Sequence, residues 1–358
     1  MPHRPTEPTD PAPADGHRTV DRTRAADARA RTGSSSGSAG VVTLGESMAA
    51  LGSLTPGPLR HASHLGLSIA GAESNVAIGV RRLGHPSAWI GRVGADEFGA
   101  LVLERLRAEQ VELTGARIDP DAPTGLLIKE QRTHDVTRVQ YYRAGSAGSR
   151  LCPEDIGAPA ARRLIADAAV LHLTGITPLL SPSAAEAVRH AVGLAAGAGV
   201  PVSLDVNHRT ALGSPERLRE LLRPLLPQVG LLFAGEEELL LLAGTDQEAE
   251  AVRLLSAEGP EGGELVVKRG AHGATVHGPD GVLHRPAVPV RAVDPVGAGD
   301  AFVAGYLTGL LDGSPIRERL RLGCLTGAFA VSVAGDWSGL PTRDELRLLD
   351  AAPGTTLR

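Results

Sequence analysis

The chain has 358 residues, a formal net charge of −5 and two cysteines. It shows no dense basic stripe, so we do not expect nucleic acid as its main partner. A membrane span would need about 18 consecutive apolar residues, and no such run occurs. Two cysteines suit a reducing compartment, so we expect a cytoplasmic protein.

Residues 1–40 differ from the rest in composition. They are rich in Pro, Ala, Arg, Thr, Ser and Gly, with Val20 as their one branched aliphatic residue. Such a segment cannot bury enough apolar surface to offset the entropy of ordering. We therefore predict a disordered tail over 1–40, one large domain over 41–350 and a short C-terminal tail over 351–358.

Short apolar runs alternate with helix-period segments along this domain. The runs are typical of strands buried on both faces, and they cover 41–45, 88–94, 169–175, 201–207, 230–235 and 264–270. Apolar residues at helical spacing lie between them, in 71–84, after Asp96 and around 185–194. This alternation predicts an α/β fold of three layers, with a mostly parallel central sheet between helices.

Two segments break this pattern. Residues 55–70 carry two prolines and then alternate, while residues 124–143 predict a hairpin with Leu126 and Ile128 on one arm and Tyr141 on the other. A few strands outside a helix-flanked sheet indicate a small β lid.

The sequence lacks the motifs that several other kinds of functional site require. The lysines, Lys129 and Lys268, lie in no Gly-Lys-Ser/Thr motif, so a Walker-A loop is excluded, and no strand precedes a dinucleotide-type glycine pattern. The Gly-x-Ser-x-Gly match at 33–37 follows no strand. His61 and His64 have no acidic or cysteine partner at ligand spacing, so they do not indicate a metal site.

Gly297, Ala298, Gly299 and Asp300 open an apolar helical run. The first N–H groups of a helix carry partial positive charge, and small side chains let an anion approach them. Asp300, whose ordinary pKa of about 3.9 leaves it ionised, is then suited to accept a proton from an attacking hydroxyl. Alternatively Asp300 only complements the helix dipole and the glycines form a tight turn. The spacing alone leaves both readings open.

Two motifs carry a family resemblance. "DPVGAGDAFVAGYLTGL" (294–310) resembles the second signature of the ribokinase-like (PfkB) sugar kinases, and "GAESNVAIGVRRLG" (71–84) resembles their first. The similarity covers roughly residues 41–345. It implies a ribokinase-like three-layer α/β/α fold with a small β lid, and ATP-dependent phosphorylation of a sugar.

Further stretches resemble one branch of that family, the 2-keto-3-deoxygluconate kinases. They include Tyr-Tyr-Arg at 141–143 and Asp-x-Asn-x-Arg at 205–209, which in that branch hold an acid sugar. Arginine is suited to this because it binds carboxylates through paired, charge-assisted hydrogen bonds. The implied substrate-binding residues are Gly71, Glu73, Asn75, Tyr141, Arg143, Asp205, Asn207 and Arg209.

The resemblance also implies a mechanism. Asp300 takes the proton from a primary hydroxyl, which attacks the γ-phosphorus of ATP while the N–H groups of Gly297, Ala298 and Gly299 stabilise the transferring group. Mg²⁺ bridges the phosphates. The implied nucleotide-binding residues are Glu238, Lys268, Gly270, Gly273, Gly297, Gly299 and Cys324, with Glu238 near Mg²⁺ and Asp294 as the candidate for K⁺.

Three positions depart from the family pattern. The Asn-x-x-Glu element near Mg²⁺ is here 235–238, which keeps only Glu238. Leu127 stands where some acid-sugar kinases have tyrosine, and Cys324 where close relatives often have asparagine near the adenine. The exact acid and the nucleotide preference therefore stay open.

The alternatives are a fructokinase, ribokinase or nucleoside kinase of the same fold, and a non-catalytic sugar- or nucleotide-sensing relative. Exposed alternating strands in a lid favour pairing between subunits, so we expect a homo-oligomer formed through the lid.

Overall fold

The computed structural model describes residues 40–133 and 136–350. The tails predicted over 1–40 and 351–358 lie outside these residues, apart from Gly40. Within the described ranges, no helix combines the length and the apolar character that a bilayer crossing requires.

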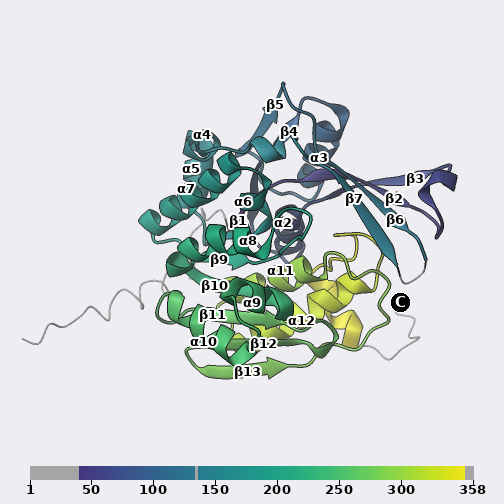
Figure 1. Ribbon diagram of the computed structural model, residues 1–358. Helices are drawn as coiled ribbons and strands as arrows, with labels where there is room; N and C mark the ends of the chain where they lie inside the picture. Colours follow the sequence, from purple (N-terminus) through teal and green to yellow (C-terminus); the bar gives the residue numbers. More distant parts are fainter. Residues whose placement is uncertain (1–39, 134–135, 351–358) are drawn as a thin grey trace, which may run out of the picture. The chain divides into compact units, whose positions relative to one another are not determined.

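The described residues form a nine-stranded sheet with helices on both sides (Figure 1). Its strands are β1 (Val41–Leu44), β4 (Ser87–Gly94), β5 (Ala116–Asp119), β8 (Val170–Thr174), β9 (Val202–Asp205), β10 (Val229–Gly235), β11 (Glu264–Lys268), β12 (Ala274–Gly278) and β13 (Gly281–Arg285). Their order is β13-β12-β11-β10-β9-β8-β1-β4-β5. Pairs from β11 to β5 are parallel, and only β12 and β13 at one edge pair antiparallel. The predicted mostly parallel sheet is confirmed.

The helices that cover the sheet are α2 (Ala72–Arg82), α3 (Glu97–Ala108), α4 (Pro153–Gly157), α5 (Pro159–Ala166), α6 (Ile176–Leu180), α7 (Pro182–Ala198), α8 (Pro215–Leu222), α9 (Glu236–Ala243), α10 (Glu248–Glu258), α11 (Ala298–Leu311) and α12 (Ile316–Val331). Strand β1 shows how they divide between the two faces. Val42 and Leu44 pack into a core shared with α7 and its neighbours, whereas Val41 packs into a core shared with α2, α11 and α12. Burial on both faces explains why the strands are continuous apolar runs.

Local sequence sets several helix ends. The Asp96 carboxylate accepts a hydrogen bond from the Gly99 N–H at 2.7 Å and caps α3. Ser181 caps α7 with Pro182 in its first turn, and Gly199, with φ of 69°, ends that helix. The helices predicted after Asp96 and around 185–194 are confirmed.

The lid is a separate four-stranded sheet in the order β3-β2-β6-β7, and it projects to the right in Figure 1. Its strands are β2 (Met48–Ser53), β3 (Leu65–Ala70), β6 (Leu126–Gln131) and β7 (Thr137–Tyr142). The predicted hairpin is confirmed, because β6 and β7 pair antiparallel. Strand β2 was not predicted, since "MAALGS" lacks regular alternation and follows β1 after three residues.

Large apolar side chains remain exposed on and beside the lid, among them Leu54, Leu67 and Tyr142. They suit the predicted pairing of lids between subunits. The homo-oligomer itself stays a prediction.

Helices α11 and α12 pack closely because α11 carries glycine at the contact. A Cβ atom on Gly305 would lie 2.4 Å from the Thr326 hydroxyl oxygen and 2.6 Å from the Leu322 carbonyl oxygen. The same Thr326 hydroxyl donates to the Ala301 carbonyl at 2.7 Å and joins the two helices. Since α11 begins at the turn of residues 297–299 that was predicted to bind an anion, this contact fixes where that turn lies.

Gly305→Ala is expected to lower the melting temperature, because overpacking a tight contact costs about 1–3 kcal/mol. Gly193→Ala in α7 is the matched control: its Cβ would enter open space, and alanine stabilises a helix interior by about 0.5–1 kcal/mol relative to glycine. Thermal unfolding should therefore shift in opposite directions. If both variants changed the melting temperature by the same amount in the same direction, the close packing of α11 on α12 would be contradicted.

Candidate active site

Asp300 lies in the first turn of α11 and is only 8% exposed. The amide nitrogen of Asn75, on α2, donates to its Oδ2 at 2.8 Å, and that of Asn207, after β9, lies 3.5 Å from its Oδ1. Gly71 immediately precedes α2, and its carbonyl accepts the Asn75 backbone N–H. The two sequence motifs thus meet at one carboxylate.

Burial changes the acidity of this group. The pKa of Asp300 is raised to about 7, mainly by burial. The Asp205 carboxylate also raises it, while the Asn75 hydrogen bond and the charges of Arg209 and Lys268 lower it. The ordinary pKa expected from the sequence is therefore wrong, because sequence position gave no measure of burial. A carboxylate with a pKa near 7 is suited to gain and lose a proton at neutral pH.

The anion-binding turn predicted at 297–299 opens α11. Gly297 has φ of 79°, and a Cβ atom there would lie 1.9 Å from the Asp336 carbonyl oxygen, so only glycine fits. A Cβ atom on Gly299 would lie 3.3 Å from Lys268 Nζ. The N–H groups of Ala298 and its neighbours therefore begin a helix beside a lysine ammonium, which is favourable for a phosphate.

Lys268 is held by Asp205. Its Nζ lies 2.7 and 2.6 Å from the two carboxylate oxygens. Burial alone would lower the pKa of Lys268, but the Asp205, Glu238 and Asp300 carboxylates outweigh burial and raise it. Lys268 therefore stays charged, and Asp205, which is buried, positions this lysine.

Glu238 shapes the turn that carries Asn207. Its Oε2 accepts the Gly235 N–H at 2.7 Å and its Oε1 accepts the His208 N–H at 2.9 Å. Asn207 adopts φ of 41°, which few residues other than glycine adopt. Among residues 40–133 and 136–350, no group of three or more His, Cys, Asp or Glu side chains could hold a metal alone. A Mg²⁺ ion near Glu238 would therefore have to take most of its ligands from phosphate and water.

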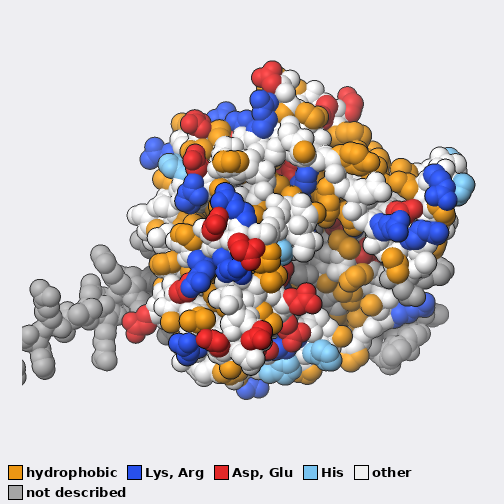
Figure 2. Space-filling view, viewed as in Figure 1, with side chains coloured by type: hydrophobic (Ala, Val, Ile, Leu, Met, Phe, Trp, Pro, Cys, Tyr) orange, Lys and Arg blue, Asp and Glu red, His pale blue; other side chains and the backbone are white. Residues whose placement is uncertain are grey.

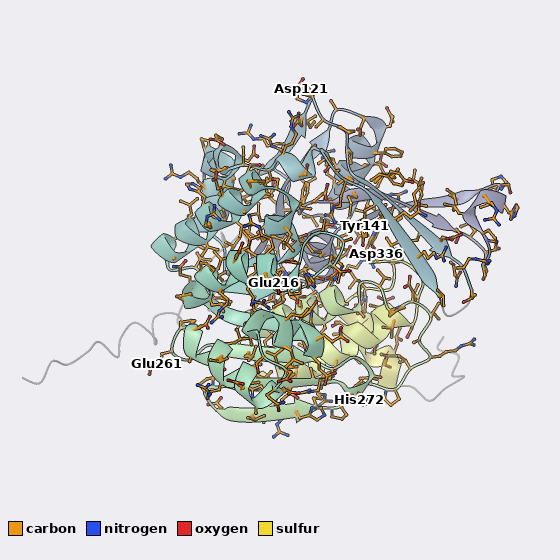
Figure 3. The ribbon with its side chains drawn as sticks, in the orientation of Figure 1. Asp121, Tyr141, Glu216, Glu261, His272 and Asp336 are labelled. Atoms are coloured by element: carbon orange, nitrogen blue, oxygen red, sulfur yellow. The ribbon has the colours of Figure 1, made fainter. Side chains whose placement is uncertain are left out.

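On the sugar side, Arg143 is buried against Glu46. Its Nε and Nη2 lie 2.7 and 2.5 Å from Glu46 Oε2, and Ser146 donates to Oε1 at 2.5 Å. The ring of Tyr141, labelled on the lid in Figure 3, lies 5.4 Å from the Arg143 guanidinium carbon. Glu46 therefore offsets the charge of Arg143. The sequence signal for Glu46 was its position directly after the first strand, where polar residues cluster in such sheets.

The Glu73 side chain lies between the ends of β1 and β8. Its Oε1 accepts hydrogen bonds from the hydroxyls of Thr174 and Thr177 at 2.6 and 2.7 Å, and burial raises its pKa. A Cβ atom on Gly45 would lie 2.2 Å from the Glu73 carboxyl carbon. In this conformation Glu73 supports the ends of β1 and β8, so a substrate contact by Glu73 stays a prediction.

Arg209 differs from Arg143. It is exposed, its Nη1 donates to the His208 carbonyl at 3.1 Å, and its charge lowers the pKa of Asp300. In the part of the chain that the structure describes, no carboxylate forms an ion pair with Arg209. It is thus the better placed of the two arginines to meet a carboxylate from solution.

The predicted nucleotide side is formed by the turn after β11. Gly270 and Gly273 have φ of 52° and 92°, and a Cβ atom on Gly273 would lie 2.0 Å from the Arg285 carbonyl oxygen. Cys324 packs in the core beneath this edge, and burial raises its pKa to about 11, so the thiol stays neutral. Its contact with adenine stays a prediction.

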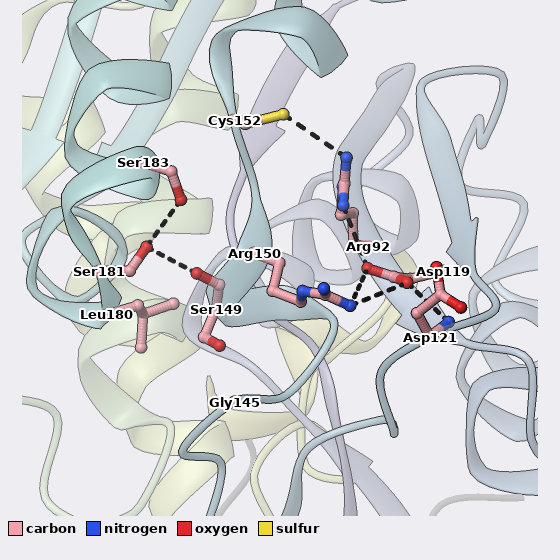
Figure 4. A pocket seen from close by; sticks show the side chains of 10 residues that line it. All are labelled: Arg92, Asp119, Asp121, Gly145, Ser149, Arg150, Cys152, Leu180, Ser181 and Ser183. Atoms are coloured by element: carbon pink, nitrogen blue, oxygen red, sulfur yellow. Dashed lines mark hydrogen bonds and ion pairs between the residues drawn. The ribbon is translucent and has the colours of Figure 1, made fainter.

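A separate cavity of about 570 Å³ is lined by none of the predicted site residues (Figure 4). The two arginines that line it are already paired: Arg92 lies 3.1 Å from Asp119 and Arg150 lies 3.3 Å from Asp119, while Arg92 also lies 2.7 Å from Asp155 outside the lining. Among the described residues that line this cavity, no arginine is left unpaired to bind a phosphate or a carboxylate.

Several known proteins are similar to this chain in sequence. Residues 38–343 match the pfkB family of carbohydrate kinases. A 2-dehydro-3-deoxygluconokinase from Thermoproteus tenax is 39% identical over 318 residues, 87% of this chain and 94% of that protein. One from Bacillus subtilis is 34% identical over 86% of this chain and 94% of its own length. A Klebsiella pneumoniae fructokinase is 35% identical over 77% of this chain and 90% of that protein.

Solved structures share the fold. A PfkB protein from Polaromonas is 36% identical with a TM-score of 0.77, covering 86% of this chain and 98% of that one. An E. coli protein assigned provisionally as ribokinase II, in complex with ATP and Mg²⁺, is 26% identical with a TM-score of 0.80, covering 87% and 99%. A Vibrio cholerae fructokinase double mutant with fructose, ADP and potassium ion is 26% identical with a TM-score of 0.75, covering 88% and 99%.

The family match, over residues 38–343, spans nearly all of the described residues. The chain therefore belongs to the pfkB family of carbohydrate kinases, and it is an ATP-dependent phosphotransferase with a ribokinase-like fold.

Proposed function

We propose that this enzyme phosphorylates the primary hydroxyl of a keto-deoxy sugar acid, converting 2-keto-3-deoxygluconate to 2-keto-3-deoxy-6-phosphogluconate. The observation that carries the chemistry is a buried carboxylate, Asp300, whose pKa lies near 7 beside the open start of α11. The substrate class is supported by the relatives named 2-dehydro-3-deoxygluconokinase.

The acceptor hydroxyl would meet Asp300 beside Asn75. The Oδ1 atom of Asn75 is buried and has no hydrogen-bond partner among the described residues, so it can accept a bond from a sugar hydroxyl. Asp300 takes the proton as the hydroxyl oxygen bonds to the γ-phosphorus and the bond to the β-phosphate oxygen breaks, which releases ADP. The N–H groups of 297–299 and the Lys268 ammonium stabilise the transferring phosphoryl.

When bound, Mg²⁺ would neutralise phosphate charge near Glu238. The turn at Gly270 and Gly273 would receive the nucleotide, and its shape depends on glycine because both residues have positive φ.

Arg209 is the proposed partner of the acid's carboxylate, with Arg143 and Tyr141 lining the same side of the site. A second candidate, a fructokinase, is favoured by one observation: Glu46 already offsets the charge of Arg143. A neutral sugar would need no spare cation there. The fructokinase relative at 35% identity is consistent with this alternative.

Asp300→Asn is expected to lower kcat by about 10²–10⁴-fold, because the amide cannot accept the proton. The change is nearly isosteric, so ATP affinity measured by calorimetry should stay close to wild type. A coupled ADP assay measures the rate, and near-normal kcat in this variant would contradict the role of Asp300 as base.

The pH profile follows from the raised pKa of Asp300. The base acts when deprotonated, so kcat/KM should fall with decreasing pH below about 7 and level off above it. Arg209 lowers this pKa, so the midpoint in Arg209→Ala should move to higher pH. A profile that stays flat down to the ordinary aspartate range would contradict the burial argument.

Arg209→Ala should raise KM for 2-keto-3-deoxygluconate by about tenfold or more, since charge-assisted hydrogen bonds contribute about 1.5–3 kcal/mol. KM for fructose should change little. Arg217→Ala is the matched control, because Arg217 is also exposed but pairs with Glu220 on α8. Wild-type turnover of fructose that equals or exceeds turnover of the acid would favour the fructokinase instead.

A further inference from the structure

Lys129 points from the lid toward the start of α11. It lies on β6, its side chain is only 14% exposed, and its ammonium forms an ion pair with Asp336. The same Nζ lies 3.9 Å from Asp294 Oδ2. Figure 3 labels Asp336 on the loop that follows α12, below the lid. The sequence motifs assigned no role to this lysine.

The two carboxylates belong to the segments that shape the anion-binding turn. Asp294 accepts the Val296 N–H through Oδ1 at 3.0 Å and the Gly335 N–H through Oδ2 at 3.1 Å. The Asp336 carbonyl oxygen packs against Gly297 at the turn itself. A charge placed between Asp294 and Asp336 therefore acts on the position of the turn.

Without a cation, this region would repel nucleotide. Asp294, Asp336 and Asp300 are three carboxylates near a site that must take in the phosphates of ATP, and such repulsion is strong where water is scarce. The family resemblance made Asp294 a candidate for K⁺. In this chain the Lys129 ammonium already lies at these carboxylates, so they do not fit an added monovalent cation.

We propose that Lys129 is an internal cation that takes the place of a dissociable monovalent ion beside the anion-binding turn. Because it is carried by β6, its charge reaches the turn only when the lid stands over it. A groove of about 280 Å³ lies between lid and loop and is lined by Lys129, Asp294 and Asp336; Figure 2 shows the surface hollowed on this side of the lid. The inference rests on kinase activity and not on which sugar is phosphorylated.

The test compares wild type with Lys129→Met, which keeps an unbranched stem and removes the charge. Rates are measured with tetramethylammonium as the only monovalent cation, and then with KCl at matched ionic strength. Wild-type kcat should be the same in both salts. Lys129→Met should lose about 10²-fold in kcat, because a shift of the turn would misplace the reacting groups. Added KCl should restore much of this kcat, and the rate should reach a plateau as the KCl concentration rises.

Arg138→Ala is the matched control, since it also removes a lid cation. Arg138 lies on β7, is exposed and is 3.9 Å from Glu130, away from the loop. Its kcat should equal that of wild type in both salts. A loss of activity in this variant that matches Lys129→Met would overturn a specific role for Lys129.

Melting curves without sugar give a second measurement that is independent of the acceptor. KCl should raise the melting temperature of Lys129→Met but not of wild type. The proposal fails if wild type requires K⁺, if Lys129→Met keeps its kcat, or if KCl restores neither its kcat nor its melting temperature. If Lys129→Met does not fold in either salt, the same measurements are made on Lys129→Gln.

Discussion

The proposed site depends on one constraint: a carboxylate must remain close to the helix start that would bind phosphate, without repelling the phosphate. Burial partly resolves this by raising the pKa of Asp300 to about 7, which lowers its average charge at neutral pH. Lys268 supplies a positive charge beside Gly299. We infer that Lys129 supplies another beside Asp294 and Asp336. The only two lysines of the chain thus approach the same turn from different elements.

The scaffold brings these groups together through close helix packing. Glycine at Gly305 lets α12 approach α11, and glycine at Gly297 lets the loop at Asp336 touch the start of α11. Asn75 reaches Asp300 from α2, which packs on the same face of the sheet. Glycine is therefore required at these contacts because the neighbouring segments lie too close for a Cβ atom, and at Gly297 also because of its backbone conformation.

We infer that the choice of sugar depends on how two arginines are paired. Arg143 is buried and paired with Glu46, whereas Arg209 is exposed and its charge lowers the pKa of Asp300. A buried pair that is already satisfied contributes orientation, while an exposed guanidinium retains donors for a ligand.

The sequence by itself determined the alternation of strands and helices, the hairpin of β6 and β7, and the glycine turn before Asp300, because spacing and capping are local. Tertiary structure decided which charges meet. Asn75 and Asp300 are 225 residues apart, Lys129 and Asp336 are 207 apart, and Glu46 and Arg143 are 97 apart. The pKa of Asp300 and the partners of both lysines depend on burial and on these long-range contacts, which no local pattern encodes.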